Sequence, residues 1–217
     1  MSAIVKKSLV DQIYEQLKNE IINQDLVWGE KLNVNELQER FEISCTPIRE
    51  AINRLQKEGF VEYKNNVGAR VIDIKEKDVA EIQEVALTLD CAAIKYAIRN
   101  GDINSLCEEL LNQINKYKEA EDEITRSKCT DEFSNILYKY AENEKLLSVA
   151  KPIKGLQGML KSTYRKEKKQ LSNMEEHVAI YNAIKNKDFL AAVEAMEDNY
   201  KKGTELLVKV FEDKKDK

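Results

Sequence analysis

Two short stretches near the start of the chain concentrate the basic residues that suit a polyanion. Residues 44–57 contain three bases and one acid, and residues 64–70 contain two bases and no acid. The whole chain carries a net charge of −4, so these stretches stand out from an acidic background. Lysine and arginine pair with phosphates, and arginine also fits the edge of guanine. The local charge therefore indicates a nucleic-acid contact.

The composition excludes several other classes of protein. The chain has 217 residues, of which 42% are apolar and 34% charged, which is enough apolar surface for a core. With only 7 Gly and 2 Pro, turns are few, and a mostly helical fold is favoured over a sandwich or barrel. A single histidine excludes a catalytic site built on a histidine pair.

The expected location is the cytoplasm. Four cysteines, at positions 45, 91, 107 and 129, lack CxxC spacing and are typical of thiols in a reducing compartment. The first residues lack the apolar core of a signal peptide, and no run approaches a membrane span, so no membrane partner is expected.

The elements that position the basic stretches are three helices and a hairpin. Apolar periodicity predicts a helix over 9–22, and a second short helix after Asn33 or Asn35 as N-cap. A third helix starts at Ser44 as candidate N-cap and ends near Glu58, closed by Gly59. Alternation predicts strands over 60–63 and 69–72, around a turn at 64–68. This order predicts a winged helix-turn-helix domain over residues 1–73.

The rest of the chain shows helical periodicity throughout. After a charged linker at 73–77, helices are expected over 78–99, 104–120, 124–142, 144–166, 174–186 and 188–212. The residues Ser172 and Glu175 have the spacing of a capping box before the fifth of these. The fold class is therefore mainly α, with an antiparallel bundle of six or seven helices over residues 78–217.

The stretch from Gly29 to Val71 resembles the GntR family of bacterial transcription regulators. The residues in register with the family pattern are Ser44, Thr46–Ala51, Arg54–Leu55, Glu58–Val61 and Gly68. The helical remainder resembles the effector domain of the FadR-type (FCD) branch. Phe133, Glu176–His177 and Ala195–Met196 fall at matching places there, among others.

The resemblance and the helix geometry together give a set of candidate DNA-binding residues. A recognition helix enters the major groove by its N-terminal residues, and hydroxyls near a helix N-terminus suit phosphate oxygens. A wing with a tight glycine turn lies along the backbone or minor groove. The candidates are Asn35, Ser44, Cys45, Thr46, Arg49, Arg54, Lys64, Asn66, Gly68 and Arg70.

Three residues of the chain depart from the family pattern of DNA-binding residues. Two other interpretations of the candidate residues are also open. The family usually has arginine at Cys45, often at Asn35, and commonly at Val67, so a different operator and a lower affinity are expected. Cys45 is either a small neutral substitute or a reactive thiol at a helix N-terminus. The charged side chains of the third helix could form an ordinary solvated face, and Arg54 could instead pair with Glu50.

The resemblance also implies a ligand site in the bundle. Many members of the branch hold a metal at positions that correspond to Thr130, Ser134, His177 and Asn199. Only the histidine remains here, so no metal and no other cofactor is expected. By helical count Asp131 points to the solvent side of its helix and does not replace the lost acid.

The candidate effector pocket is accordingly a set of uncharged groups. Its residues are Ala86, Thr130, Ser134, His177, Tyr181 and Asn199, where Ala86 replaces an arginine that commonly anchors a carboxylate in the family. This set suits a sugar-like, amide or less acidic ligand better than a dicarboxylate. His177 could also be an ordinary core residue, and the pocket could be degenerate.

These observations predict a DNA-binding transcriptional regulator, in particular a repressor whose operator affinity a small metabolite modulates. A homodimer would read an inverted repeat in double-stranded DNA. The alternative is a regulator whose helical domain serves only dimerisation or partner binding. An enzyme is not expected, because no nucleophile–base pair, phosphate loop or paired metal motif is present.

Overall fold

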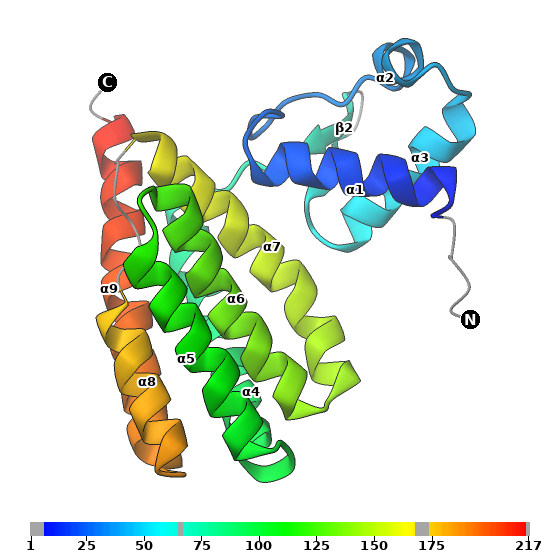
Figure 1. The fold of residues 1–217 in the computed structure, drawn as a ribbon. Coiled ribbons are helices and arrows are strands. Elements are labelled where there is room, and N and C mark those ends of the chain that lie inside the picture. The colour runs from blue at the N-terminus through cyan, green and yellow to red at the C-terminus, as the bar shows by residue number, and fades with distance from the viewer. Residues whose placement is uncertain (1–6, 65–66, 168–173, 216–217) are drawn as a thin grey trace, which may run out of the picture. The chain divides into compact units, whose positions relative to one another are not determined.

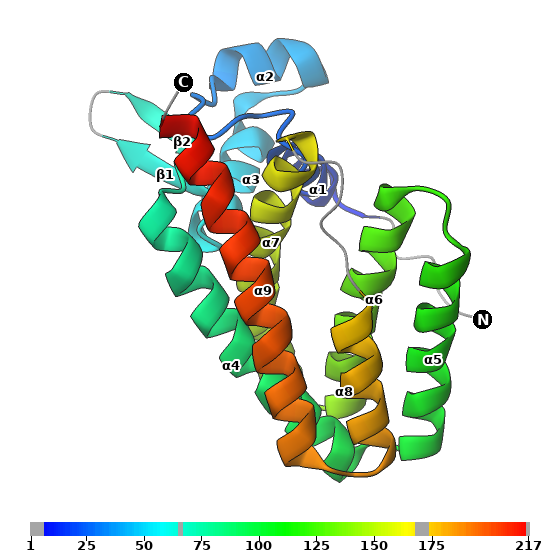
Figure 2. The same ribbon diagram turned by 90° about the vertical axis from the view of Figure 1, so that its left-hand side faces the viewer.

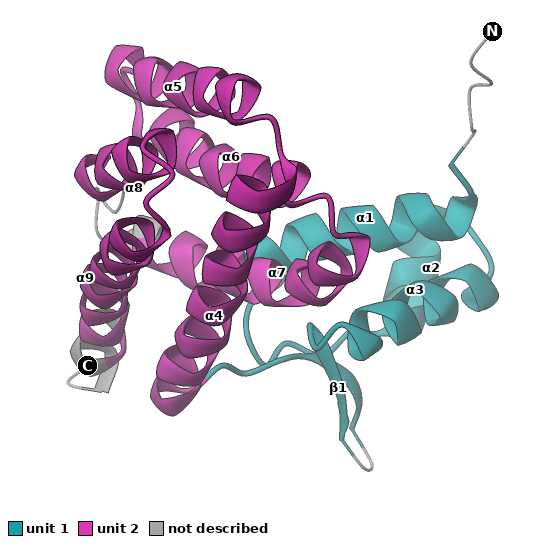
Figure 3. Ribbon diagram, turned by 90° about the horizontal axis from the view of Figure 1, so that it is seen from below, with its two compact units in different colours: residues 1–74 teal, residues 75–217 magenta. Residues whose placement is uncertain are grey.

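A computed structural model describes residues 7–64, 67–167 and 174–215. The chain divides into two compact units, residues 1–74 and residues 75–217 (Figure 3, teal and magenta). Within the described ranges the chain forms nine helices and one two-stranded antiparallel sheet, which confirms the mainly helical fold class.

Unit 1 is built on three helices, α1 (Leu9–Ile22), α2 (Val34–Phe41) and α3 (Cys45–Lys57). Both α1 and α2 pack on α3, as their apolar stripes predict. Fully buried side chains fill the space between them: Leu17, Ile21, Ile48, Ile52, Leu55 and Phe60. The expected three helices are confirmed, and the first and third begin and end within one residue of the predicted positions.

Local capping fixes the turn before α3. Asn33 rather than Asn35 caps α2, because its side chain accepts from the Asn35 backbone N–H at 3.0 Å. Glu42 ends α2 with φ +55°, and Ser44 is the N-cap of α3, as predicted. Gly59 follows α3 at φ +80°, a conformation that suits a residue without a Cβ.

The wing strands are β1 (Val61–Lys64) and β2 (Gly68–Val71). The hairpin is confirmed, but its ends differ by one residue from those predicted, because Lys64 pairs with Gly68 instead of lying in the turn. The segment before α2 pairs with β2, where the Leu32 N–H donates to the Ala69 carbonyl at 2.9 Å. The wing is therefore anchored to the helical part of unit 1.

Unit 2 is a bundle of six helices, as predicted (Figures 1 and 2). Helix α4 packs on α6, α7 and α9, while α5 packs on α6 and α8, and α8 on α9. The bounds are α4 (Glu76–Asn100), α5 (Ile103–Glu119), α6 (Glu123–Ala141), α7 (Glu144–Glu167), α8 (Glu175–Lys185) and α9 (Phe189–Lys215).

One helix of unit 2 starts earlier than predicted, and the predicted cap of another lies outside the described residues. Helix α4 begins at Glu76, inside the predicted linker, because the Lys75 backbone N–H donates to Asp78 Oδ2 at 2.7 Å and so caps the first turn. The predicted capping box before α8 includes Ser172, which lies outside the described residues.

Helix α6 is buried over a wider arc than its periodicity indicates. Tyr138 lies about 140° around the helix from Phe133, yet it is 3% exposed. Asp131, predicted to face solvent, bonds to Lys161 Nζ of α7 at 2.6 Å. The Asp131 side chain is nevertheless 48% exposed, and Asn135 is exposed, so the predicted solvent side of α6 is not contradicted.

Candidate nucleic-acid interface and candidate ligand site

The N-terminal half of α3 presents the expected polar side chains to solvent. Thr46 and Arg49 are exposed, and Cys45 is partly buried in the first turn. Ser44 is also exposed, and its hydroxyl makes no capping bond, which leaves it available to an external partner. Arg49 makes no hydrogen bond or ion pair with any residue that the structure describes. The arrangement offers a free guanidinium and two hydroxyls at one helix end.

Arg54 differs from Arg49 in having an internal partner. Its Nη1 donates to Asp11 Oδ1 of α1 at 2.6 Å, and its guanidinium carbon lies 4.1 Å from the centroid of the Tyr14 ring. The pairing with Glu50 that helical spacing suggested is replaced by a contact between α3 and α1. Arg54 therefore holds the two helices together.

The wing and α2 place the remaining candidates at separate points of unit 1. Lys64 is exposed and pairs with Glu62 at 2.8 Å, while Arg70 faces Glu62 across the hairpin. Gly68 takes φ +92°, in the left-handed region that favours glycine. The Asn35 side chain is exposed at the start of α2. Asn66 lies outside the described residues.

Two further side chains join α3 to the wing and were not identified from the sequence. Asn53 is exposed on α3, and Tyr63 is 48% exposed on β1, with its hydroxyl 3.5 Å from Asn53 Oδ1. Neither residue is charged, so the search for basic stretches missed them. Only the pairing of helix and strand brings them together.

The six residues of the expected effector pocket lie on four helices of the bundle. Ala86 and His177 are buried, and the His177 ring packs edge-on against Phe133 at 5.0 Å between centroids. Thr130 is buried too, and its hydroxyl donates to the Ser127 carbonyl of its own helix at 2.9 Å. The remaining members, Ser134, Tyr181 and Asn199, are partly buried.

Two charged side chains that are not in the predicted set lie beside Ser134. Lys154 of α7 donates from Nζ to Ser134 Oγ at 2.9 Å, and Asp90 of α4 lies 3.4 Å from the same hydroxyl. Asp90 is 6% exposed and accepts from the hydroxyls of Tyr138 at 2.7 Å and Tyr200 at 2.8 Å. The bundle thus contains a buried acid and a partly buried ammonium joined through Ser134.

The electrostatics of this centre follow from burial. Burial raises the pKa of the Tyr138 and Tyr200 phenols, and the charge of Asp90 raises both further. Burial lowers the pKa of Lys154, and Asp90 opposes that shift. The two phenols therefore act as neutral donors that stabilise the carboxylate of Asp90.

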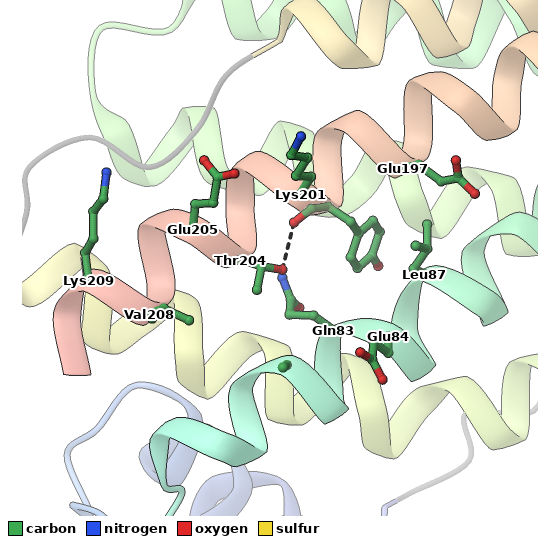
Figure 4. A pocket seen from close by; sticks show the side chains of 11 residues that line it. Gln83, Glu84, Leu87, Glu197, Lys201, Thr204, Glu205, Val208 and Lys209 are labelled. Carbon is green, nitrogen blue, oxygen red and sulfur yellow. Dashed lines mark hydrogen bonds between the residues drawn. The ribbon is translucent and has the colours of Figure 1, made fainter. Parts of the chain in front are cut away.

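The network continues to a hollow between α4 and α9. Gln157 of α7 donates to Gln83 Oε1 at 2.9 Å and to the Tyr200 hydroxyl at 3.1 Å. Gln83 and Tyr200 also line the hollow, whose volume is about 590 Å³. Figure 4 shows Gln83 and Thr204 facing each other across it, beneath the charged side chains of α9.

Part of this centre could have been found from the sequence. Asp90 falls on the inward stripe of α4, which marks a buried acid that requires partners. Lys154 gave no such signal, because its inward position depends on how α7 packs against α4 and α9. Among the described residues, no three His, Cys, Asp or Glu side chains gather closely enough to hold a metal ion.

Comparison with known proteins gives two family matches. The model of bacterial regulatory proteins of the gntR family matches residues 9–71, and that of the FCD domain matches residues 81–201, more than half of the chain. None of the helices in the described ranges is both long and apolar enough to cross a bilayer.

Relatives and solved structures agree with these matches. The chain is 28% identical to YdhC of Bacillus subtilis, named an uncharacterized HTH-type transcriptional regulator, over 94% of this chain and 93% of that protein. It is 27% identical to the gluconate operon transcriptional repressor of Bacillus licheniformis, over 85% and 79%. In fold it is similar to E. coli McbR/YncC, with a TM-score of 0.78, 20% identity and coverage of 93% and 98%.

Proposed function

The chain belongs to the gntR family of bacterial transcription regulators, with an FCD domain as its bundle, and from this we propose that it is a ligand-modulated repressor. Like its relatives and fold neighbours, it is a transcriptional regulator and not an enzyme. The proposal adds to the family assignment the sign of regulation, a dimeric state and control by a small metabolite in the cytoplasm.

The observation that carries DNA binding is the free N-terminal end of α3. Arg49 has no partner in the described part of the chain, whereas Arg54 on the same helix is bound to Asp11. An exposed arginine at this end of a recognition helix is suited to a guanine edge or a phosphate. Ser44 and Thr46, exposed beside it, supply hydroxyls for the DNA backbone.

We infer a homodimer and an inverted-repeat operator from the size of this interface. One recognition helix and one wing read only a short half-site, and a two-fold pair of such domains doubles the contacts. The name of one relative, the gluconate operon transcriptional repressor of Bacillus licheniformis, supports repression as the sign of regulation. The bundle is the unit large enough to supply a dimer contact.

The polar centre of the bundle supports modulation by a small molecule. A buried acid and an ammonium in a helical core are costly to stability unless they serve specificity or a ligand. The second candidate, a bundle that only dimerises, draws support from Thr130, whose hydroxyl is satisfied within its own helix.

Two measurements test the proposal. A gel shift of the full-length chain against fragments upstream of its own gene should show a retarded complex at low salt. A thermal-shift screen of small metabolites should then find a compound that raises the melting temperature and weakens that complex. A retarded complex with no stabilising compound would favour the dimerisation-only candidate. Absence of any complex would contradict DNA binding itself.

A further inference from the structure

We propose that Tyr63 of β1 and Asn53 of α3 together donate hydrogen bonds to one phosphate of the DNA backbone. The inference rests on the DNA binding of the proposed function and names two uncharged residues that contribute to it. Neither residue belongs to the candidates found from the sequence. The pair adds affinity for the backbone without adding charge to the interface.

Asn53 lies on the face of α3 that carries the candidate DNA-binding side chains. Each residue advances a helix by about 100°, so Thr46 lies about 60° and Asn53 about 40° from Arg49, both in the same direction. All three side chains are exposed. Asn53 therefore continues the surface that begins at Thr46, about two turns further along the helix.

Tyr63 lies next to this surface, on the wing. Side chains alternate along a strand, so Tyr63 points to the same side of β1 as Val61, which is buried. Tyr63 itself is 48% exposed, and its hydroxyl lies 3.5 Å from Asn53 Oδ1. The two side chains thus meet where the contact between α3 and the wing opens to solvent.

The hydrogen-bonding capacity of this pair is mostly unused. Within the described part of the chain neither side chain has another hydrogen-bond partner. A separation of 3.5 Å is long for a bond from a hydroxyl, so the contact is weak. Tyrosine has one O–H donor and asparagine has two N–H donors, and these donors are open to a better acceptor.

The place of the pair between helix and wing points to the DNA backbone as that acceptor. A sugar–phosphate strand separates the major groove from the adjacent minor groove. When α3 enters the major groove and the wing lies beside it, groups that bridge the two elements face this strand. Asparagine and tyrosine side chains are among the common donors to phosphate oxygens.

A purely structural role does not account for the pair. Backbone bonds already hold the wing to the helical part of unit 1, from the Ile72 N–H to the Phe60 carbonyl and from the Leu32 N–H to the Ala69 carbonyl, both at 2.9 Å. A long bond between two exposed neutral groups adds little to stability. Removal of the Tyr63 hydroxyl should therefore leave the fold intact.

The test is a fluorescence anisotropy titration of the full chain with duplexes from upstream of its own gene, at several salt concentrations. Tyr63→Phe and Asn53→Ala should each bind about tenfold more weakly, as the loss of a hydrogen bond to a charged group predicts. The dependence of affinity on salt should stay as in the wild type, because a neutral donor releases no counterion. Loss of a cation that pairs with a phosphate would instead reduce that dependence.

Two further comparisons test whether the acceptor is a single phosphate. Each variant should lose the same factor on a scrambled duplex of equal composition, because phosphates carry no sequence information. The double variant should lose less than the product of the two single losses, since both bonds hold one group and depend on each other.

Tyr96→Phe and Asn19→Ala are the matched controls. Tyr96 lies on α4 and Asn19 is exposed on α1, so the same chemical changes are made away from α3 and the wing. Both controls should keep the wild-type affinity. The melting temperatures of Tyr63→Phe and Asn53→Ala should equal or exceed that of the wild type, because neither change removes a buried contact.

Four results would overturn the inference: wild-type affinity in Tyr63→Phe or Asn53→Ala, a loss that comes with a lower melting temperature, a loss confined to the upstream duplex, or single losses that multiply in the double variant. If the wild type binds DNA and one of these results is found, the inference alone fails. If the wild type binds no duplex at low salt, the proposed function fails and the inference fails with it.

Discussion

Arg54 Nη1 lies 2.6 Å from Asp11 Oδ1, so a residue of the recognition helix is bound to the helix that supports it. The same guanidinium covers the Tyr14 ring. About one and a half turns earlier on α3, Arg49 has no such partner in the described part of the chain. The two arginines therefore have separate tasks, Arg54 within unit 1 and Arg49 toward an external partner.

The Asp11 contact predicts a pH-dependent contribution to stability. A hydrogen bond from Ser8, followed by that from Arg54, lowers the pKa of Asp11 to about 2, from an ordinary value of 3.8. A lowered pKa in the folded state stabilises the protein above the ordinary value, and the contribution is lost as the pH falls toward 2. Asp11→Asn should therefore unfold more easily than the wild type at pH 7 and equally easily near pH 2.

Urea unfolding at several pH values measures this difference. Asp25→Asn is the control, because Asp25 is exposed and its side chain has no partner in the described residues. A difference between wild type and Asp11→Asn that persists unchanged to pH 2 would rule out the ion pair as its source.

Gly101 predicts a steric requirement at the junction of α4 and α5. A Cβ there would lie 2.8 Å from the Ala97 carbonyl oxygen and 2.9 Å from that of Tyr140, both backbone atoms. Gly101→Ala should destabilise the bundle by about 1–3 kcal/mol, as overpacking does. Gly203→Ala is the control, since its Cβ would lie 3.8 Å from Gln83 Nε2, an ordinary contact.

For Gly203→Ala we expect a gain of about 0.5–1 kcal/mol, because glycine disfavours a helix interior. Thermal unfolding of both variants and the wild type measures these changes in stability. Equal melting temperatures for Gly101→Ala and the wild type would show that the junction has room to relax.

The helical period and the capping residues made most of the fold predictable. They are local signals, and they located the six bundle helices and the turn before α3. The start of α4 was missed because a lysine is not a typical N-cap, although its backbone N–H is capped by Asp78. The hairpin was displaced by one residue because Lys64 was assigned to the turn.

The site was less predictable, because its contacts join residues that are distant in the sequence. Lys154 of α7 reaches Ser134 of α6 only through the tertiary fold, and Tyr200 reaches Asp90 from a separation of 110 residues. Periodicity indicates which side of a helix is apolar but not which helix covers its polar flank.

The bundle is expected to hold the dimer together. Unit 2 has its own extended core, so a fragment of residues 75–217 should fold and sediment as a dimer at micromolar concentration. Sedimentation velocity on this fragment and on the full chain gives the comparison. A folded but monomeric fragment would contradict this prediction and would mean that the dimer contact lies in unit 1.

The bundle is also expected to bind no stoichiometric transition metal. Of the four positions implied by the family resemblance, Thr130 bonds to its own helix, and Ser134 accepts from a positively charged lysine that would repel a cation. Elemental analysis should find no zinc, nickel or manganese, and a chelator should leave the melting temperature unchanged. About one metal per chain in the wild type, absent from His177→Ala, would contradict this prediction.

The most direct test of the central claim is a DNA titration of the full chain and its Arg49→Ala variant. Fluorescence anisotropy with duplexes from upstream of its own gene should give an affinity that falls steeply with salt, as phosphate contacts require. Arg49→Ala should lose about 1–3 kcal/mol of sequence discrimination and keep the wild-type melting temperature, since its side chain has no internal partner. If no duplex binds at low salt, or if Arg49→Ala binds as the wild type does, then α3 is not the DNA-reading element.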